Sequence, residues 1–386
     1  MEKSRSYRRS LGLIELVSLG VGGTVGSGIF VVPGIAAQMT GPFSLLAWVI
    51  VALSASCVLL SLASISYHFT ASSGFYSLFE SVFGVRIAAP LMVIYCVSSI
   101  LGIATIAAGI GQYVSFFSVP SILLVEIAIL AFFLCLNCIG IALSGITENF
   151  LTLLKIVPLV IIAIVLLPFV RPENLVPAAP LTMNGLLATV IIVYWPFTGF
   201  EICAIPVEET KDPALIRRSL LLVMLVVVTL YLVLNTALIG SVGSAVLSSS
   251  PAPVAAAAGA VFPHAGEIVA FIGIIAMLSA LNAYIIATSR ILHSLGERFS
   301  VQGIRHLSRQ GTPVATLTMA CGAGMLLLLI SNRFDTLASL SVVTTLVPYI
   351  FFCLAAWILL PAPRSRLVAA AGIFSTAAIL ILYMFM

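Results

Sequence analysis

Two stretches of the chain place helix-breaking residues and polar groups inside otherwise apolar sequence. The first surrounds Thr24 and Ser27 and is rich in glycine, with a proline beyond it: Gly20, Gly22, Gly23, Gly26, Gly28, Pro33 and Gly34. The second is Trp195–Glu201, in which Pro196 removes a backbone donor and Gly199 loosens the chain. Because glycine and proline both weaken helices, each stretch predicts a break in a helix.

Broken helices offer a specific kind of binding chemistry. The N-terminus of a half-helix presents unpaired N–H groups and a positive dipole end to an anion, while freed carbonyls accept hydrogen bonds from an ammonium. A zwitterionic amino acid matches both ends. For the glycines of the first stretch, the alternative is close helix packing through small residues. The second break favours the binding interpretation, because irregular backbone at membrane depth is tolerated only inside protein or around a cavity.

Two ionisable residues also lie within apolar sequence, Lys155 and Glu201. A charged residue at the centre of a span costs about 2.5–3.5 kcal/mol on insertion scales, so each needs a reason. Lys155 is either a side chain that snorkels to the interface or a buried amine that couples transport to protons. Glu201 is either a titrating carboxyl of the same coupling or a structural acid that accepts backbone N–H groups at the break.

Cysteine and histidine suggest no metal or cofactor. The seven cysteines are scattered, nearly all within apolar runs, and form no disulfide framework. Cys135 and Cys138 share a CxxC spacing without a second pair or a histidine cluster. The four histidines fall in loops or at the ends of apolar runs, and the chain has no HExxH sequence or nucleophile with its base. We therefore expect no cofactor and no enzymatic activity.

Composition identifies the elements that must position these residues. Of 386 residues, 61% are hydrophobic and only 8% are charged, and the mean hydropathy is +1.24. These values exclude a water-soluble domain. Apolar runs of the length that crosses a bilayer recur along the chain and predict an all-α polytopic membrane protein of about eleven spans. We place the spans at Leu11–Ala37, Phe43–Tyr67, Ile87–Phe117, Ser121–Leu143, Phe150–Val170, Asn184–Ile205, Ile216–Val242, Gly266–Leu292, Val314–Ile330, Leu340–Leu360 and Leu367–Phe385.

The two predicted breaks fall in the first and sixth spans, five spans apart. That separation is expected of two inverted repeats of five helices each, so the break centres near Ser27 and Gly199 should meet at the midplane. We divide the single transporter domain, residues 1–386, into repeat one at about 11–170, repeat two at about 184–360, and an additional helix at about 367–386.

Basic residues predict the orientation. With the N-terminus in the cytoplasm, only Arg171 and Arg333 lie on the outer side, while the other Lys and Arg residues outside the spans collect on the inner side. An odd number of spans then puts the C-terminus outside. The basic residues before the first apolar run resemble a signal peptide, but the run is too long and lacks a cleavage site. We therefore expect a retained first span in the cell membrane.

At these residues the chain resembles the amino acid/polyamine/organocation (APC) superfamily of transporters. The segment Gly26–Phe30 (GSGIF) matches the family's first span, and Phe197–Glu201 (FTGFE) followed by Glu208–Pro213 (EETKDP) matches its sixth span and the loop after it. Supporting matches cover the eighth span, the start of the ninth and the tenth: Ser279–Ala283 (SALNA) with Ser289–Arg290, Gly311–Ala315 (GTPVA) and Thr345–Tyr349 (TLVPY).

The resemblance implies the five-plus-five inverted-repeat transporter fold with alternating access. It places the substrate carboxylate at Ser27 and Gly28, next to Gly26 and one turn after Thr24. It makes Trp195 a gate or platform against the substrate and puts Thr198 and Gly199 beside the amino group. In several members of the family, a lysine that matches Lys155 places its ammonium where sodium-coupled relatives bind their sodium ion. The resemblance therefore implies that transport by this protein does not depend on sodium.

Tyr95 matches an aromatic gating position of the arginine and agmatine antiporters. Their polar residue further along that span corresponds to Ile103 here, which argues against a guanidinium substrate. Members usually have twelve spans, whereas this sequence provides eleven, and the last two lie outside the transport core.

The leading hypothesis is an amino acid permease, either a proton-linked symporter or an exchanger, for a neutral and apolar amino acid. A polyamine or cationic amino acid antiporter is the alternative within transport, and a non-transporting sensor of the same fold is the alternative outside it. The expected partners are the small-molecule substrate, protons and membrane lipid, with a homodimer as the assembly to consider, and no nucleic acid.

Overall fold

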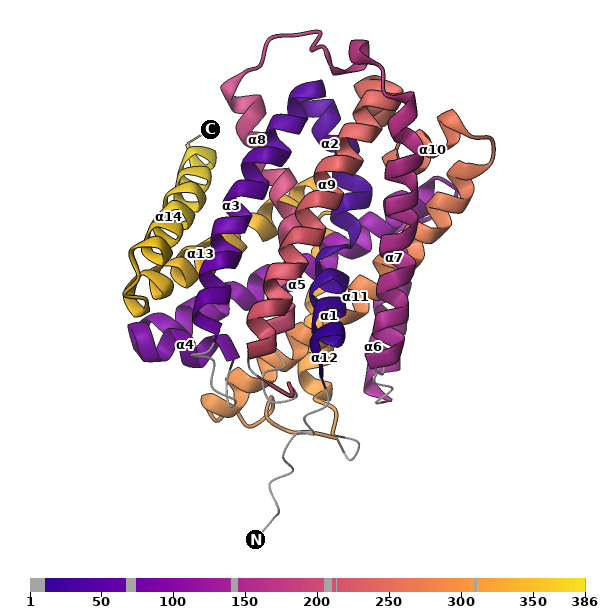
Figure 1. Ribbon diagram of the computed structural model, residues 1–386. Coiled ribbons are helices and arrows are strands. Elements are labelled where there is room, and N and C mark those ends of the chain that lie inside the picture. The colour runs from indigo at the N-terminus through magenta and orange to yellow at the C-terminus, as the bar shows by residue number, and fades with distance from the viewer. Residues whose placement is uncertain are drawn as a thin grey trace.

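The computed structural model describes residues 11–66, 74–139, 145–204, 210–212, 214–308 and 311–385. These residues form a bundle of helices that run mostly along one axis (Figure 1). The basic N-terminal segment and part of the EETKDP motif lie outside the described ranges. The all-α polytopic fold expected from composition is confirmed.

The helices follow the predicted spans in order. The first half of the chain contains α1 (Leu13–Thr24), α2 (Ser27–Thr40), α3 (Ser44–Ile65), the short α4 (Gly74–Phe83), α5 (Val85–Ser115), α6 (Ile122–Cys138) and α7 (Gly145–Leu166). The second half contains α8 (Met183–Tyr194), the 3-10 turns η5 (Trp195–Phe197) and η6 (Phe200–Ala204), α9 (Ala214–Ser248), α10 (Pro253–Val261), α11 (Ala265–Arg298), α12 (Val314–Ile330), α13 (Phe334–Leu359) and α14 (Pro363–Met384).

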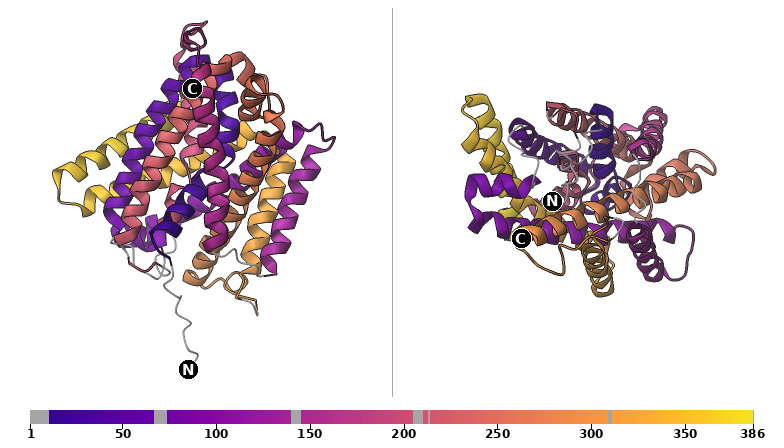
Figure 2. Two further views of the ribbon diagram at one scale, coloured as in Figure 1. Left: turned by 45° about the vertical axis from the view of Figure 1, so that its right-hand side comes forward. Right: turned by 90° about the horizontal axis from the view of Figure 1, so that it is seen from below.

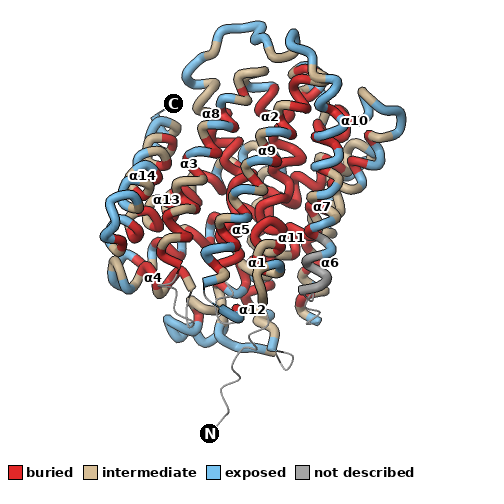
Figure 3. The backbone as a smooth tube through the Cα atoms, in the orientation of Figure 1, coloured by how far each residue is buried: buried red, intermediate tan, exposed pale blue. Residues whose placement is uncertain are grey.

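The outer surface of the bundle is apolar, as lipid requires. Leu124 on α6, Ile330 at the end of α12 and Phe374 on α14 are 67%, 82% and 78% exposed. Buried residues occupy the middle of the bundle, and exposed ones lie on its outer faces and end loops (Figure 3). Together with the long apolar helices, this surface identifies a multi-pass membrane protein.

Several helix boundaries differ from the predicted spans. The tenth span begins at Phe334 rather than Leu340, because Arg333 pairs with Asp335 and so allows charged residues at the helix start. The eighth continues to Arg298, beyond the predicted end at Leu292, since a helix need not stop where its apolar run stops. The yellow α14 packs against α3 and α13 at the margin of the bundle (Figure 2).

Both predicted helix breaks are present. Between α1 and α2, Val25 has φ −81° and ψ 89°, and Gly26 has φ −137° and ψ −144°, neither of which is helical. In the sixth span, α8 passes into η5 and then into an extended residue, Thr198. Gly199 follows with φ +93°, a backbone conformation that residues with a Cβ rarely adopt. The discontinuous first and sixth helices are thus confirmed.

The two breaks also lie against each other. A Cβ added to Gly28 would stand 2.6 Å from Cα of Pro196, and one added to Gly199 would stand 2.8 Å from the carbonyl oxygen of Gly23. The backbones approach this closely because glycine has no side chain there. The expectation that segments far apart in sequence meet at their breaks is therefore confirmed.

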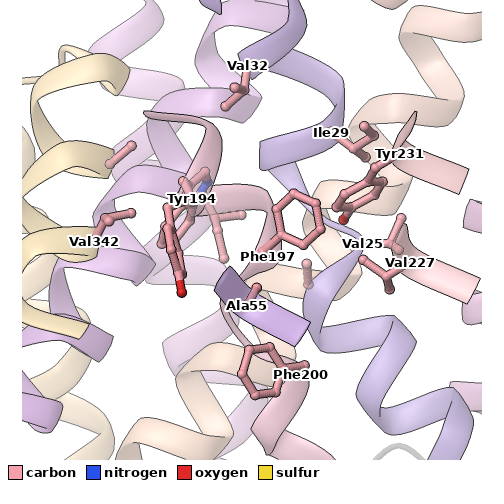
Figure 4. Close-up of a cluster of buried hydrophobic side chains, with 14 of the residues drawn as sticks. Val25, Ile29, Val32, Ala55, Tyr194, Phe197, Phe200, Val227, Tyr231 and Val342 are labelled. Carbon is pink, nitrogen blue, oxygen red and sulfur yellow. The ribbon is translucent and has the colours of Figure 1, made fainter. Parts of the chain in front are cut away.

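Aromatic packing supports one side of this junction. Phe197 of η5 packs edge-on against Tyr231 of α9, with ring centroids 5.2 Å apart, and contacts Trp48 of α3 at 5.9 Å. Figure 4 shows Phe197 and Tyr231 beside Val25 and Ile29 of the broken first helix. All five side chains are buried, so the irregular backbone is enclosed by protein as the bilayer demands.

Candidate functional site

The N-terminus of α2 lies in the interior of the protein. Gly26 caps the helix, Ser27 begins it, and the Ser27 side chain is 1% exposed. The first N–H groups of any α-helix have no acceptor within that helix, and the helix dipole adds positive potential there. The Gly26 N–H donates to the Thr24 carbonyl at 3.1 Å, while the N–H groups of Ser27 and Gly28 beside it form a neutral backbone site that suits an anionic group such as a carboxylate.

The C-terminal carbonyls of α1 are held by side chains from other helices. The carbonyl of Gly22 accepts a hydrogen bond from Nζ of Lys155 at 3.0 Å, and that of Thr24 accepts one from the Tyr231 hydroxyl at 3.1 Å. The Thr24 hydroxyl itself donates to the Gly20 carbonyl at 2.6 Å. The broken end of α1 is thus stabilised as a negative dipole end close to Gly199.

Lys155 is buried, with 1% of its surface exposed. One turn before it on α7, the Thr152 hydroxyl donates to the Ser18 carbonyl of α1 at 3.0 Å. Both contacts fasten α7 to α1. A lysine that reached the membrane interface would be exposed at its tip, so the snorkelling interpretation does not fit this geometry.

Trp195 and Tyr284 enclose the site from the second half of the chain. Nε1 of Trp195 donates to Oγ of Ser27 at 3.3 Å, which links η5 to the start of α2. The Trp195 and Tyr284 rings have centroids 6.2 Å apart and planes tilted by 50°. The Thr198 hydroxyl donates to the Trp195 carbonyl at 2.8 Å and so holds the break in shape.

A cavity of about 10 Å³ lies at the junction of the two breaks. It is lined by Gly23, Thr24, Gly26, Ser27, Gly28, Ile106, Trp195, Thr198 and Tyr284. A single water needs roughly 10–15 Å³ of such space, so an amino acid does not fit unless the walls move. The structure therefore has a closed arrangement of the candidate site, with Trp195 and Tyr284 in its wall.

Glu201 accepts hydrogen bonds from three donors. The Tyr95 hydroxyl of α5 donates to Oε1 at 2.9 Å, while the Tyr349 hydroxyl of α13 and the Gly199 backbone N–H donate to Oε2 at 2.8 and 3.1 Å. Glu201 is 3% exposed. The carboxylate therefore satisfies a backbone group at the break, as the structural interpretation expects, and also ties α5 and α13 to the sixth span.

Tyr95, for which the resemblance implies an aromatic gating position, lies beside the junction of the breaks and contacts Glu201. Its hydroxyl bonds Glu201, and its ring packs edge-on against Phe75 of α4 at 5.9 Å. The cavity at the junction of the breaks does not include Tyr95 among its lining residues. The geometry thus groups Thr24, Gly26, Ser27, Gly28, Trp195, Thr198 and Gly199 in one place, with Tyr95 and Glu201 adjoining and Lys155 behind α1.

Sequence reasoning missed Tyr284 and gave Tyr349 no role. Tyr284 follows directly after the SALNA match of the eighth span, and Tyr349 ends the TLVPY match of the tenth. Each is an aromatic residue with a polar tip inside a span, Tyr349 buried and Tyr284 partly buried, which is a usable signal because such a tip normally finds a partner. The partner of each could not be read from a single sequence.

Metal binding has no obvious place among the described residues. Within them, no group of three or more His, Cys, Asp or Glu side chains gathers as metal ligands do. The seven cysteines are unpaired thiols, and Cys135 is exposed on α6.

Comparison with known proteins finds similar sequences among amino acid permeases. A family model described as amino acid permease matches residues 11–386. The branched-chain amino acid permease BcaP of Bacillus subtilis (strain 168) is 24% identical over an alignment of 277 residues that covers 65% of this chain and 58% of that protein. The aligned part of this chain thus spans less than two thirds of that relative.

Two further relatives align over more of their length. The aromatic amino acid permease FywP of Lactococcus lactis subsp. cremoris (strain MG1363) is 27% identical over 76% of this chain and 70% of its own. L-asparagine permease 2 of Mycobacterium bovis (strain ATCC BAA-935 / AF2122/97) is 26% identical over 83% of this chain and 70% of its own. The names of these three permeases cover branched, aromatic and amide side chains, so the three agree on amino acids and differ on which one.

Proposed function

Because this chain belongs to the amino acid permease family, we propose that it is a secondary active transporter that moves a neutral amino acid across the cytoplasmic membrane by alternating access. One observation carries the proposal. The N-terminus of α2 and the break of the sixth span adjoin in the buried middle of the bundle, around Ser27, Trp195 and Thr198. Such paired breaks are where transporters of this architecture bind substrate.

The substrate carboxylate is assigned to the start of α2. The N–H groups at Ser27 and Gly28 and the Ser27 hydroxyl supply donors without a fixed charge, and Thr24 lies one turn before them. The ammonium is assigned to the carbonyl-rich side, near Thr198, Gly199 and the Gly23 carbonyl that faces Gly199. A neutral site with donors at one end and acceptors at the other favours a zwitterion.

Two groups of side chains act as gates in this proposal. Trp195 and Tyr284 cover the substrate, and they must separate to admit it because the cavity of about 10 Å³ is too small. The cluster of Tyr95, Glu201 and Tyr349 joins α5, the sixth span and α13, and its release would let these helices part toward the cytoplasm. Alternation between the two gates gives access from one side at a time.

Lys155 is assigned to coupling. Its ammonium bonds the Gly22 carbonyl at the broken end of α1, so it supplies a fixed positive charge to the element that moves. A tethered cation there replaces a sodium ion, and loss of its proton would remove that charge and weaken the contact between α1 and α7. We therefore expect sodium-independent transport that is linked to protons or proceeds by exchange.

The proposal includes an orientation of the protein in the cytoplasmic membrane. The basic residues of the loops put the N-terminus in the cytoplasm and the end of α14 on the opposite side. The beginning of α1 and the end of α14 lie toward opposite ends of the bundle in Figure 1, which agrees with that placement.

Uptake by purified protein in liposomes tests the function. The expected result is accumulation of a labelled neutral amino acid that continues when sodium is replaced by choline and responds to an imposed pH gradient. Sodium-dependent uptake that ignores pH would contradict the coupling. Saturable binding without any flux would instead identify a sensor.

A further inference from the structure

A second cavity, of about 20 Å³, adjoins the proposed substrate site. Trp195, Thr198 and Tyr284 line both cavities, so these three residues lie at the boundary between them, and Trp195 and Tyr284 are the gate of the proposed substrate site. Hydroxyl-bearing residues of α5, α11 and α13 contribute to its wall: Ser98, Ser99, Thr288, Ser341 and Thr345. A group that extends from a substrate held at Ser27 and Thr198 can enter this cavity.

Most of these hydroxyls are already engaged within the protein. The hydroxyls of Ser98 and Thr345 bond each other, and the Ser341 hydroxyl donates to the Ser98 carbonyl at 2.9 Å. The Ser99 hydroxyl donates to the Tyr95 carbonyl at 2.9 Å. The bonds of Ser98 and Ser341 join α5 to α13, whereas the Ser99 bond lies within α5, and together they fix the shape of the wall.

Thr288 is the exception. Its side chain is 1% exposed, and within the described residues its Oγ1 has no hydrogen-bond partner. Buried hydroxyls nearly always have a partner, so a hydroxyl without a protein partner at a cavity wall is available to bond a group that enters the cavity. Thr288 lies on α11 one turn beyond Tyr284, on the same face of that helix.

The hydrogen bonds of Glu201 in the cavity wall limit the kind of substrate side chain that can bind there. Glu201 also lines this cavity, but its two oxygens already accept from Tyr95, Tyr349 and the Gly199 N–H. Three donors leave that carboxylate at most about one acceptor site for a cationic side chain, whose other N–H groups would be buried without an acceptor there. A purely apolar side chain would leave Thr288 unpaired. An uncharged group that can form hydrogen bonds satisfies both conditions.

We propose that this cavity receives the substrate side chain and that the preferred substrates are amino acids with a small, uncharged, hydrogen-bonding side chain, ending in a hydroxyl or a carboxamide. Thr288 is the residue that recognises that group. The proposal rests on the proposed transport function and replaces the apolar side chain expected from the sequence. The volume admits a group about the size of one water before the walls move.

The isosteric pair L-threonine and L-valine tests the proposal, since the two differ only in a hydroxyl and a methyl group. Purified protein in liposomes is assayed for uptake of each, with L-alanine and L-lysine for comparison. The expected result is a preference for threonine over valine of about tenfold or more, because a site built to bond a hydroxyl rejects the analogue that lacks it. Lysine uptake should be weaker than that of threonine.

Three variants connect the preference to Thr288. T288V keeps the shape and should lower the threonine-to-valine ratio about three- to tenfold, which is what loss of one hydrogen bond predicts. T288S keeps the hydroxyl and should retain the ratio. S279A is the matched control, because Ser279 carries a buried hydroxyl without a partner on the same helix but does not line this cavity; it should leave the ratio unchanged.

The outcomes separate this proposal from the function on which it rests. Equal uptake of threonine and valine by the wild-type protein, or a T288V variant with the wild-type ratio, overturns the assignment while transport stands. Preferred uptake of lysine overturns the neutral class. No uptake of any amino acid removes the transport function itself.

Discussion

The indole Nε1 of Trp195 lies 3.3 Å from Oγ of Ser27 and donates a hydrogen bond to it. The two residues are far apart in sequence and come from the two broken helices. Because Nε1 donates to the oxygen, the Ser27 O–H remains available to donate to the proposed substrate carboxylate, but the indole ring closes the cavity beside it. Substrate must therefore displace Trp195 to reach Ser27, which makes this contact a gate as well as a structural link.

Binding of substrate should change the fluorescence of Trp195. The chain has three tryptophans, and the ring of Trp195 must move because the cavity in the closed arrangement is too small for an amino acid. We expect a saturable change in intrinsic fluorescence on titration with a transported amino acid. The change should disappear in W195F and persist in W357F, since Trp357 lies on the outer face of α13 and is 43% exposed. An unaltered signal in W195F would argue against movement of this side chain.

Close contact between the two breaks predicts a strong effect of G28A. The added methyl group would lie 2.6 Å from Cα of Pro196, and this backbone atom cannot yield as the end of a side chain can. Overpacking of this kind costs about 1–3 kcal/mol, and here it also separates the two half-helices. We expect transport to be lost and the melting temperature in detergent to fall.

G322A provides the control, because a Cβ at Gly322 of α12 meets nothing within 4 Å. This variant should retain wild-type transport and stability. Wild-type transport by G28A would show that the junction is looser than its geometry implies.

Removal of the Lys155 charge should uncouple transport from protons. K155M preserves the length of the side chain but loses the ammonium that bonds the Gly22 carbonyl. Uptake by K155M should no longer respond to an imposed pH gradient, although amino acid binding should persist because Lys155 lies behind α1. K211M, which changes an exposed lysine, is the control. A K155M variant with the wild-type pH response would exclude Lys155 from coupling.

Replacement of Glu201 should weaken the cluster that joins α5, the sixth span and α13. In E201Q one of the two carboxylate oxygens becomes an NH₂ group, so at least one of the donors Tyr95, Tyr349 and Gly199 N–H loses its acceptor, and each buried donor left unpaired costs about 1–3 kcal/mol. The expected result is lower thermal stability, with Y349F causing a smaller loss. The exposed acid Glu173 supplies the control variant, E173Q.

The same variants distinguish the two interpretations of Glu201. A purely structural carboxylate predicts reduced stability with the wild-type pH dependence of uptake. A role in proton coupling predicts that E201Q also loses that dependence. Full stability of E201Q would contradict the importance of the three hydrogen bonds.

The helix breaks could be predicted from sequence because their cause is local. Gly26 and Gly199 break the helices through their own backbone freedom, and Pro196 through its missing backbone donor. Each break can therefore be recognised from the residue type at its own position. Their spacing along the chain then predicted that they meet. Lys155 and Glu201 could be recognised for the same reason, because each is an ionisable residue within apolar sequence.

Partners across helices could not be predicted in this way. Tyr349 and Glu201 are separated by 148 residues, and only the packing of α13 against α5 and the sixth span brings their side chains together. The same applies to Thr288, which in sequence is one more threonine in an apolar helix and is recognisable only because it borders a cavity without a partner. Such relationships depend on tertiary structure, which a single sequence does not specify.

Counterflow in liposomes tests the transport function most directly. Vesicles that contain purified protein are loaded with an unlabelled neutral amino acid, and entry of the same amino acid carrying a label is followed without any ion gradient. We expect labelled substrate to accumulate transiently above its external concentration in wild-type vesicles and not in those that contain G28A. A wild-type protein that binds the amino acid yet gives no counterflow would contradict the transporter and identify a sensor with the same site.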